Sequence, residues 1–233
     1  MKDDIYQKAA IAQRSDDTYA LIAPLLGGIM DLDTARRIAE VSESFGVKTL
    51  KVTGAQRLTL FGIKEEDIDA AYEALGMKPQ PGAALCQQYV KVCPGSSFCA
   101  RGTRDTISFA QRLIERFYPF PKMTSKVKIG IAGCFNSCVE PAIKDIGLIG
   151  LPKGWIMMIG GAGGKDPMIG EVVARNLTDD QVLDLMEPLL KYYRAEGSKA
   201  ATKNERLGRI LKNAGIERVL GLMGLSRDSN TEG

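Results

Sequence analysis

Apolar residues recur with two different periods in residues 17–77, which predicts a unit built from both strands and helices. Runs rich in β-branched and aromatic residues are typical of strands, whereas apolar residues three and four apart are typical of one helix face. Gly46 stands where the first helical pattern ends, as a C-terminal stop. The expected elements are a strand at 18–26, a helix at 33–46, strands at 48–53 and 56–63, and a helix at 64–76.

The order of these elements, β-α-β-β-α, is that of a ferredoxin-like half-domain. Prolines and a glycine then interrupt the pattern at 79–88, which is typical of a linker. We therefore expect an α+β chain in two parts, a ferredoxin-like half-domain at 1–78 and a second domain at 79–233.

The second part combines strands and helices in a different order. Thr178 and Gln181 have the spacing of a capping box at the start of its last long helix. The apolar stripe of that helix, with Val182 and Met186, is expected to be core. The expected elements are a helix at 103–118 with Thr103 as N-cap, strands at 126–133, 145–151 and 155–160, a helix starting at Asp166-Pro167 and a helix at 178–193.

The composition is that of a globular protein without a strong charge. Of the 233 residues, 45% are hydrophobic, and the net charge is +3, without the basic stripe of a nucleic-acid-binding protein. The N-terminal segment is polar, unlike a secretory signal. The longest apolar stretch, 19–30, is interrupted by Pro24 and is shorter than the roughly 20 residues of a membrane-spanning helix. We expect a cytoplasmic protein.

Five cysteines and the absence of histidine restrict the possible chemistry. An odd number of cysteines without a secretory signal argues against a disulfide framework. Without imidazole, haem or zinc ligation by histidine is excluded, as is a Ser-His or Cys-His nucleophile. Metal chemistry in this chain must therefore depend on thiolates. The cysteines are Cys86, Cys93, Cys99, Cys134 and Cys138.

Four of these cysteines form two pairs, Cys93 with Cys99 and Cys134 with Cys138. A helical turn at the second pair would place both sulfurs on one face, and a helix following Cys99 would favour an anionic cluster at its N-terminus. The spacing favours an iron–sulfur cluster over zinc, because zinc sites usually separate paired cysteines by two to four residues. A zinc site and unrelated buried cysteines remain alternatives, and Cys86 is expected to be a small buried hydrophobe.

Several segments together resemble the sirohaem-dependent nitrite and sulfite reductases. The pattern C-x5-C followed by C-x3-C resembles the cluster signature of that family. KVTGAQRLTLFGI resembles its strand pair against the sirohaem, and SKVKIGIAGCFNSCVEP resembles its Lys-x-Lys strand and second cysteine pair. DIGLIG and GWIMMIGGAGGKDPMIGEVV resemble the sheet and glycine-rich segment that follow. The resemblance covers about residues 17–195, and the size is similar to that of the small assimilatory-type sulfite reductases.

This resemblance implies that 79–233 is an α/β domain that binds sirohaem and a [4Fe-4S] cluster. Cys93, Cys99, Cys134 and Cys138 would hold the cluster, and Cys138 would also be the axial ligand of the sirohaem iron. The implied reaction is the six-electron reduction of sulfite to sulfide or of nitrite to ammonia. An external donor such as a ferredoxin would supply electrons. The alternative is a non-catalytic iron–sulfur electron-transfer protein, or a subunit of a larger redox complex, on the same fold.

Lys126 and Lys128 match the family's lysine pair, which binds the anionic substrate. Residues i and i+2 of a strand share a face, so both ammonium groups are expected to point the same way. Each could contribute up to about 4 kcal/mol at 4 Å from an oxyanion, at an effective dielectric constant of 20. A solvated strand edge of alternating polarity is the other interpretation.

Further residues match positions near the substrate and the sirohaem. Arg57 is expected to bind the substrate or a sirohaem carboxylate, although the family's arginine matches the place of Ala55. A solvated side chain is the alternative for each arginine. The glycine-rich segment 160–164 lacks both the dinucleotide and the Walker patterns, so close backbone approach is expected there. The other expected sirohaem-binding residues are Thr53, Arg101, Arg104 and Asn136.

The chain carries only one copy of a module that larger family members carry twice. Those members build the sirohaem pocket from two pseudo-symmetric copies. We therefore expect a homo-oligomer, most simply a twofold dimer. In it, a partner would supply Lys126 and Lys128 to the other chain's sirohaem. The alternative is a monomer with an unusually open pocket.

Overall fold

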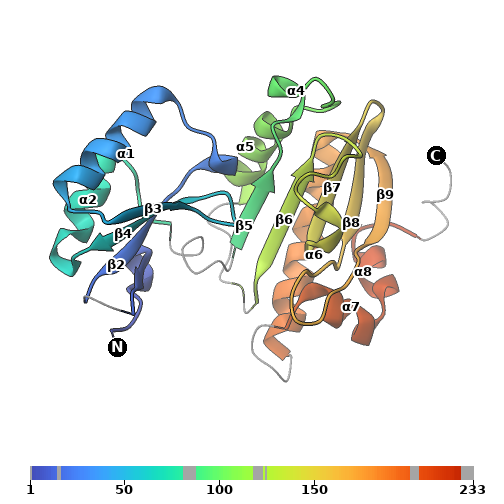
Figure 1. The fold of residues 1–233 in the computed structure, drawn as a ribbon. Coiled ribbons are helices and arrows are strands. Elements are labelled where there is room, and N and C mark those ends of the chain that lie inside the picture. Colours follow the sequence, from blue (N-terminus) through green and yellow to red (C-terminus); the bar gives the residue numbers. More distant parts are fainter. Residues whose placement is uncertain are drawn as a thin grey trace. The chain divides into compact units, whose positions relative to one another are not determined.

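The computed structural model divides into two units, Met1–Tyr89 and Val90–Gly233 (Figure 1). Most of the predicted linker at 79–88 lies outside the described residues, and so does Cys86. Both predictions therefore stay open. The structure describes residues 2–14, 17–80, 88–117, 123, 125–199 and 205–226.

The first unit is an antiparallel sheet in the order β1-β2-β4-β3, packed against two helices. The predicted order β-α-β-β-α is confirmed, with β1 as an additional edge strand. The elements are β1 Ala10–Ala12, β2 Tyr19–Ala23, α1 Leu32–Ser44, β3 Thr49–Val52, β4 Leu58–Ile63 and α2 Ile68–Leu75, with short 3-10 turns at Tyr6–Lys8, Leu26–Gly28 and Glu65–Asp67.

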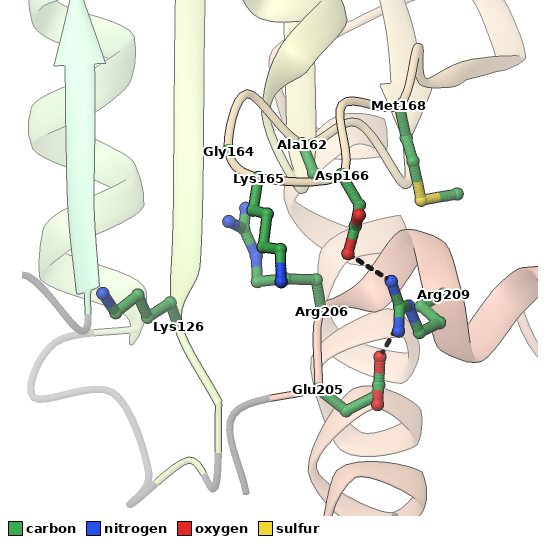
Figure 2. Close-up of a pocket in the computed structure, with 9 residues that line it drawn as sticks. All are labelled: Lys126, Ala162, Gly164, Lys165, Asp166, Met168, Glu205, Arg206 and Arg209. Atoms are coloured by element: carbon green, nitrogen blue, oxygen red, sulfur yellow. Dashed lines mark hydrogen bonds and ion pairs between the residues drawn. The ribbon is translucent and has the colours of Figure 1, made fainter. Parts of the chain in front are cut away.

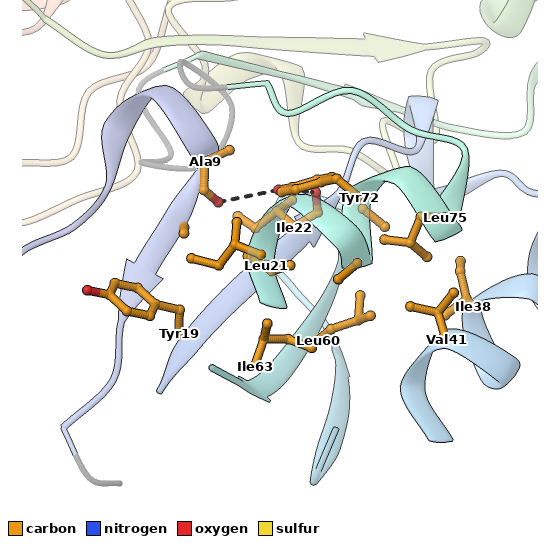
Figure 3. Packing of buried hydrophobic residues seen from close by; sticks show 14 residues of the cluster. Ala9, Tyr19, Leu21, Ile22, Ile38, Val41, Leu60, Ile63, Tyr72 and Leu75 are labelled. Atoms are coloured by element: carbon orange, nitrogen blue, oxygen red, sulfur yellow. Dashed lines mark hydrogen bonds between the residues drawn. The ribbon is translucent and has the colours of Figure 1, made fainter. Parts of the chain in front are cut away.

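The core of this unit lies between the sheet and the helices (Figure 3). Leu21 and Leu60 from the central strands are fully buried, and Ile38 from α1 and Tyr72 from α2 pack with them. Since alternate residues of a strand face opposite ways, the neighbours of Leu60 along β4 point to the second face of the sheet. Thr59 is one of these residues of the second face.

The second unit is a five-stranded sheet in the order β5-β6-β7-β8-β9. Strands β6 and β7 are parallel, and β8 is antiparallel to both of its neighbours. The elements are β5 Gln88–Val92, α4 Gly95–Phe98, α5 Thr106–Phe117, β6 Val127–Ala132, η4 Pro141–Ile143, β7 Ile146–Leu151, β8 Gly154–Ile159, β9 Glu171–Leu177, α6 Asp179–Lys199, α7 Leu207–Ala214 and α8 Ile216–Leu222.

The capping box predicted for α6 is confirmed. The Thr178 N–H donates to Gln181 Oε1 at 2.8 Å, and the Gln181 N–H donates to Thr178 Oγ1 at 3.2 Å. Among the described helices, none has the length and apolar content that crossing a membrane requires.

The helix predicted from Asp166-Pro167 is wrong. Two backbone hydrogen bonds between Ala162 and Met168, of 2.9 and 2.8 Å, close this segment into a loop. The chain then continues as strand β9, which pairs with β8. The valines of β9 favour a strand, and pairing with β8 outweighs the helix-start signal of the proline.

Candidate functional site

The two cysteine loops follow neighbouring strands and are tied together at one end of the sheet. Cys93 directly follows β5, and its N–H donates to the Ile131 carbonyl of β6 at 3.1 Å. The Gly133 N–H, directly after β6, donates to Cys93 Sγ at 3.0 Å. Thr103 donates to the Gly133 carbonyl from its N–H at 2.8 Å and from its hydroxyl at 2.7 Å. Strand adjacency therefore joins loops that are distant in sequence.

Thr103 is thus a bridge between the loops, and its predicted role as N-cap of α5 is wrong. The cap is Asp105, whose Oδ1 accepts the N–H groups of Ile107 and Ser108 at 3.2 and 3.1 Å. Hydrogen bonds from Ser108, assisted by Ser97, lower the pKa of the Asp105 carboxyl. The helix therefore starts later than its sequence pattern indicates.

Glycines allow close backbone approach both within the first cysteine loop and between the two loops. Within the first loop, a Cβ on Gly102 would lie 2.5 Å from the Ser96 nitrogen. Between the loops, a Cβ on Gly133 would lie 3.0 Å from Gly95 Cα, and Gly95 has φ +57°, a conformation that favours glycine. A larger residue at Gly133 would force the two loops apart, and one at Gly102 would disrupt the first loop.

The second cysteine pair lies on turns, so the helical turn considered for it is wrong. The Ser137 N–H donates to the Cys134 carbonyl at 3.2 Å, and the Glu140 N–H donates to the Ser137 carbonyl at 2.8 Å. Ser137 and Glu140 have positive φ values, 51° and 49°. These left-handed residues end each turn before a helix can form.

The four thiols differ in exposure. Cys93 is buried, Cys99 and Cys134 are half-buried, Cys138 is exposed, and all four are free. Within the described ranges, no three cysteine or acidic side chains converge in a metal-binding arrangement. The structure therefore brings the two loops together, but not the four sulfur atoms onto one point.

The donor set fits an iron–sulfur cluster nonetheless. Thiolates are the ligands of such clusters, and N–H groups donating to the ligand sulfurs tune them. The hydrogen bond from Gly133 to Cys93 is of this kind. Turns rather than regular elements carry Cys134 and Cys138.

Lys126 and Lys128 lie at the opposite end of β6 from the cysteines. Both are half-buried on one face of the strand, while Val127, Ile129 and Ile131 are buried on the other. At about 3.3 Å per residue, Lys128 and Cys134 are about 20 Å apart along the chain.

The segment η4 packs on the same sheet between the two groups. A Cβ on Gly130 would lie 2.9 Å from Lys144 Cγ, and one on Gly147 would lie 2.7 Å from the Pro141 carbonyl carbon. The structure therefore does not bring the lysine pair to the cysteine loops of its own chain.

A buried ion pair fixes the strand beside Lys128. Asp145 is fully buried and accepts the Lys128 N–H at 2.8 Å. Arg206 donates to both of its oxygens, from Nε at 3.0 Å and from Nη2 at 2.6 Å. Burial, and next the charges of Arg206 and Lys126, lower the pKa of the Lys128 ammonium group.

Lys126 lines an open pocket of about 330 Å³ (Figure 2). Arg209 donates to Asp166 at 2.6 Å and to Glu205 at 3.1 Å. In Figure 2, Lys165 extends beside Arg206, and Lys126 reaches from β6 apart from the other side chains. Sequence reasoning missed these further cations because they come from a distant loop and from α7.

Three other predicted residues lie on or beside the cysteine loops. Arg101 and Asn136 are exposed. Arg104 is half-buried, and its Nε donates to the Leu151 carbonyl at 3.0 Å, so much of its function is to hold the loop against β7. The close approach expected in the glycine-rich segment is present, since a Cβ on Gly161 would lie 2.6 Å from the Lys144 carbonyl.

Thr53 and Arg57 lie in the first unit, at the hairpin between β3 and β4. The Thr53 N–H donates to the Arg57 carbonyl at 2.8 Å, and the Arg57 N–H donates to Thr53 Oγ1 at 3.3 Å. Arg57 is buried. Thr59, two residues further along β4, is also buried, and sequence reasoning missed it.

Two known families match the chain. The family described as "Nitrite/Sulfite reductase ferredoxin-like half domain" matches residues 11–78, and "Nitrite and sulphite reductase 4Fe-4S domain" matches residues 86–228. An assimilatory-type sulfite reductase of Nitratidesulfovibrio vulgaris is 33% identical over 91% of this chain and 95% of its own. A nitrite reductase [NAD(P)H] of Bacillus subtilis is 31% identical over 88% of this chain, which spans only 25% of that protein.

Two solved structures share the fold. The Mycobacterium tuberculosis NirA protein superposes with a TM-score of 0.72 at 21% identity, covering 87% of this chain and 39% of its own. Dissimilatory sulfite reductase I superposes with a TM-score of 0.76 at 13% identity, and the match covers 93% of this chain and 72% of that protein's chain. The predicted α+β fold, a ferredoxin-like half-domain followed by a cluster-type domain, is confirmed. The chain belongs to the nitrite and sulfite reductase family.

Proposed function

We propose that this chain reduces sulfite to sulfide, with nitrite to ammonia as the second reaction, using a [4Fe-4S] cluster and sirohaem. An external donor such as a ferredoxin supplies the six electrons. The observation that carries the proposal is the joining of the two cysteine loops at one end of the sheet, through the N–H···S bond from Gly133 to Cys93. The full-length similarity to a sulfite reductase supports sulfite as the first substrate.

Cys93, Cys99, Cys134 and Cys138 are the proposed cluster ligands. Cys138 is the most exposed of the four, which suits a thiolate that also reaches the sirohaem iron. When bound, the two cofactors together supply the electron path to the substrate. Arg101 and Asn136, exposed on the same loops, are proposed to bind sirohaem, as are Thr53, Arg57 and Arg104.

Lys126 and Lys128 are proposed to hold the anionic substrate and to donate protons to it. The lowered pKa of Lys128 makes its ammonium group a better proton donor than an ordinary lysine. Because Lys128 is about 20 Å along the chain from Cys134 and η4 packs on the sheet between the lysines and the cysteine loops, the lysines are proposed to serve a second copy in a homodimer. The predicted cytoplasmic location stays a prediction.

Anaerobic steady-state kinetics with a reduced viologen as donor tests the proposed reaction. Cofactor-replete protein is expected to consume six electrons per sulfite, with a higher kcat/KM for sulfite than for nitrite. Protein that takes up both cofactors but reduces neither anion would instead be an electron-transfer protein, the alternative function for this fold.

A further inference from the structure

The hydroxyl of Thr59 is buried without a hydrogen-bond partner. Thr59 is 3% exposed, and its Oγ1 contacts no donor or acceptor among the described residues. Buried hydroxyl groups are normally paired, so an unpaired one calls for an explanation. Within the described part of the chain, the other two such hydroxyls, of Ser125 and Tyr192, belong to the second unit, and Ser125 lies beside the Tyr193 hydroxyl.

Thr59 lies on the second face of the first sheet, away from its hydrophobic core. Its neighbour Leu60 is fully buried in the core cluster, and alternate residues of a strand face opposite ways. Thr59 therefore shares a face with Arg57, two residues before it. Lys51 of β3 stands directly opposite Thr59 in the strand register, so two cationic side chains flank the hydroxyl.

A packing role alone does not account for a threonine at this position. Valine has nearly the same shape, favours a strand equally well, and would leave no unpaired hydroxyl in the buried site. The hydroxyl is thus unfavourable in the protein alone and becomes favourable only if a ligand accepts its hydrogen bond.

We infer that the Thr59 hydroxyl donates a hydrogen bond to an anionic oxygen of a bound ligand. This inference rests on the proposed function, which provides two sources of such an oxygen, a carboxylate of the tetrapyrrole or the oxyanion substrate. Arg57 and Lys51 supply the positive charge that an anionic acceptor requires. Thr59 is then a ligand-binding residue whose unpaired hydroxyl lowers the stability of the ligand-free protein.

The test compares Thr59→Val with Thr59→Ser, which keeps the hydroxyl. Without sirohaem, Thr59→Val is expected to raise Tm by about 2–4 °C, since it removes the unpaired group. The same variant is expected to weaken binding about tenfold. Weaker sirohaem binding in an absorbance titration identifies the carboxylate, and a raised KM at full sirohaem content identifies the substrate. Thr59→Ser is expected to keep the sirohaem affinity and the KM near those of the wild type.

Unchanged sirohaem affinity and unchanged KM in Thr59→Val would overturn the inference and leave the proposed function intact. So would a lowered Tm of the sirohaem-free variant, because the hydroxyl would then already be satisfied. A wild-type protein that takes up no sirohaem would overturn the proposed function and this inference together. If Thr59→Val does not fold, Thr59→Ala removes the same hydroxyl and is judged by the same two affinities.

Discussion

At the scale of single residues, Asp145 is a fully buried charge that links two elements of the second unit. It joins the backbone of β6, through the Lys128 N–H, to the start of α7, through Nε and Nη2 of Arg206. Its side chain is fully buried and that of Arg206 is 19% exposed. Breaking such a pair leaves a buried charge uncompensated. Asp145 was not singled out in the sequence because its partner lies 61 residues away.

Asp145→Asn is therefore expected to lower the free energy of unfolding by about 3–5 kcal/mol. The matched control is Asp166→Asn, which breaks an exposed pair with Arg209, with side chains 63% and 49% exposed, and should cost less than about 1 kcal/mol. Urea unfolding of the two variants measures both values. Equal decreases in the free energy of unfolding would show that the buried pair stabilises the fold no more than the exposed pair.

Lys128 gives a pH dependence of known sign. Its pKa in the folded protein lies below the ordinary 10.5, mainly because of burial, so the unfolded chain binds the proton more tightly. The contribution of Lys128 to stability therefore rises with pH between the lowered pKa and 10.5 and is lost as the pH falls. Relative to Lys128→Gln, the wild type should gain stability with pH in this interval. Parallel pH profiles of the two proteins in urea unfolding would contradict this.

At the scale of elements, the site depends on two loops that pack closely because of their glycines. Strands β5 and β6 place the loops at the same end of the sheet, and Gly133 lets the second loop approach the backbone of the first at Gly95. Gly102 allows a similarly close approach to Ser96 within the first loop.

Gly102→Ala should therefore prevent cluster incorporation, because its Cβ would lie 2.5 Å from the Ser96 nitrogen. Gly164→Ala is the control, because a Cβ at that position meets nothing within 4 Å. Iron and acid-labile sulfide content of the purified proteins measures the effect. A Gly102→Ala protein with the wild-type iron content would show that the cluster does not require this close packing within the first cysteine loop.

The elements also show which structural features a sequence reveals. Periodicity predicted β2, β4, α1, α2 and α6, because each of them buries apolar residues. It also predicted β3, although all four residues of that strand are exposed. It failed at Asp166-Pro167, where a local helix signal was overridden by pairing of β9 with β8, and at Thr103, whose hydroxyl serves the other loop. The cysteine spacing predicted a candidate site, which stays a prediction, but the unpaired hydroxyl of Thr59 has no signature in a single sequence.

At the scale of the whole molecule, the separation of lysines and cysteines along β6 makes a single copy incomplete under the proposed function. A sulfite site needs thiolates and cations together, yet η4 packs between the two groups in one chain. A twofold dimer supplies both groups to each site, since a symmetric interface repeats every contact.

Complementation tests this arrangement. A Lys126→Gln/Lys128→Gln variant and a Cys138→Ala variant should each be inactive alone. Co-expressed, they should recover about a quarter of the wild-type activity, because half of the dimers are mixed and each carries one complete site. No recovery, with sedimentation showing mixed dimers, would place the lysines in the site of their own chain. A fully active monomer would also contradict the arrangement.

The absorption spectrum of anaerobically purified protein is the decisive measurement, because the proposed function requires four thiolates that hold one cluster with sirohaem beside it. The spectrum should show chlorin-type bands. Iron analysis of the same protein should give about five iron atoms per chain, four in the cluster and one in the sirohaem. A broad shoulder without those bands would contradict the catalytic account. A colourless protein containing zinc would contradict the cluster itself.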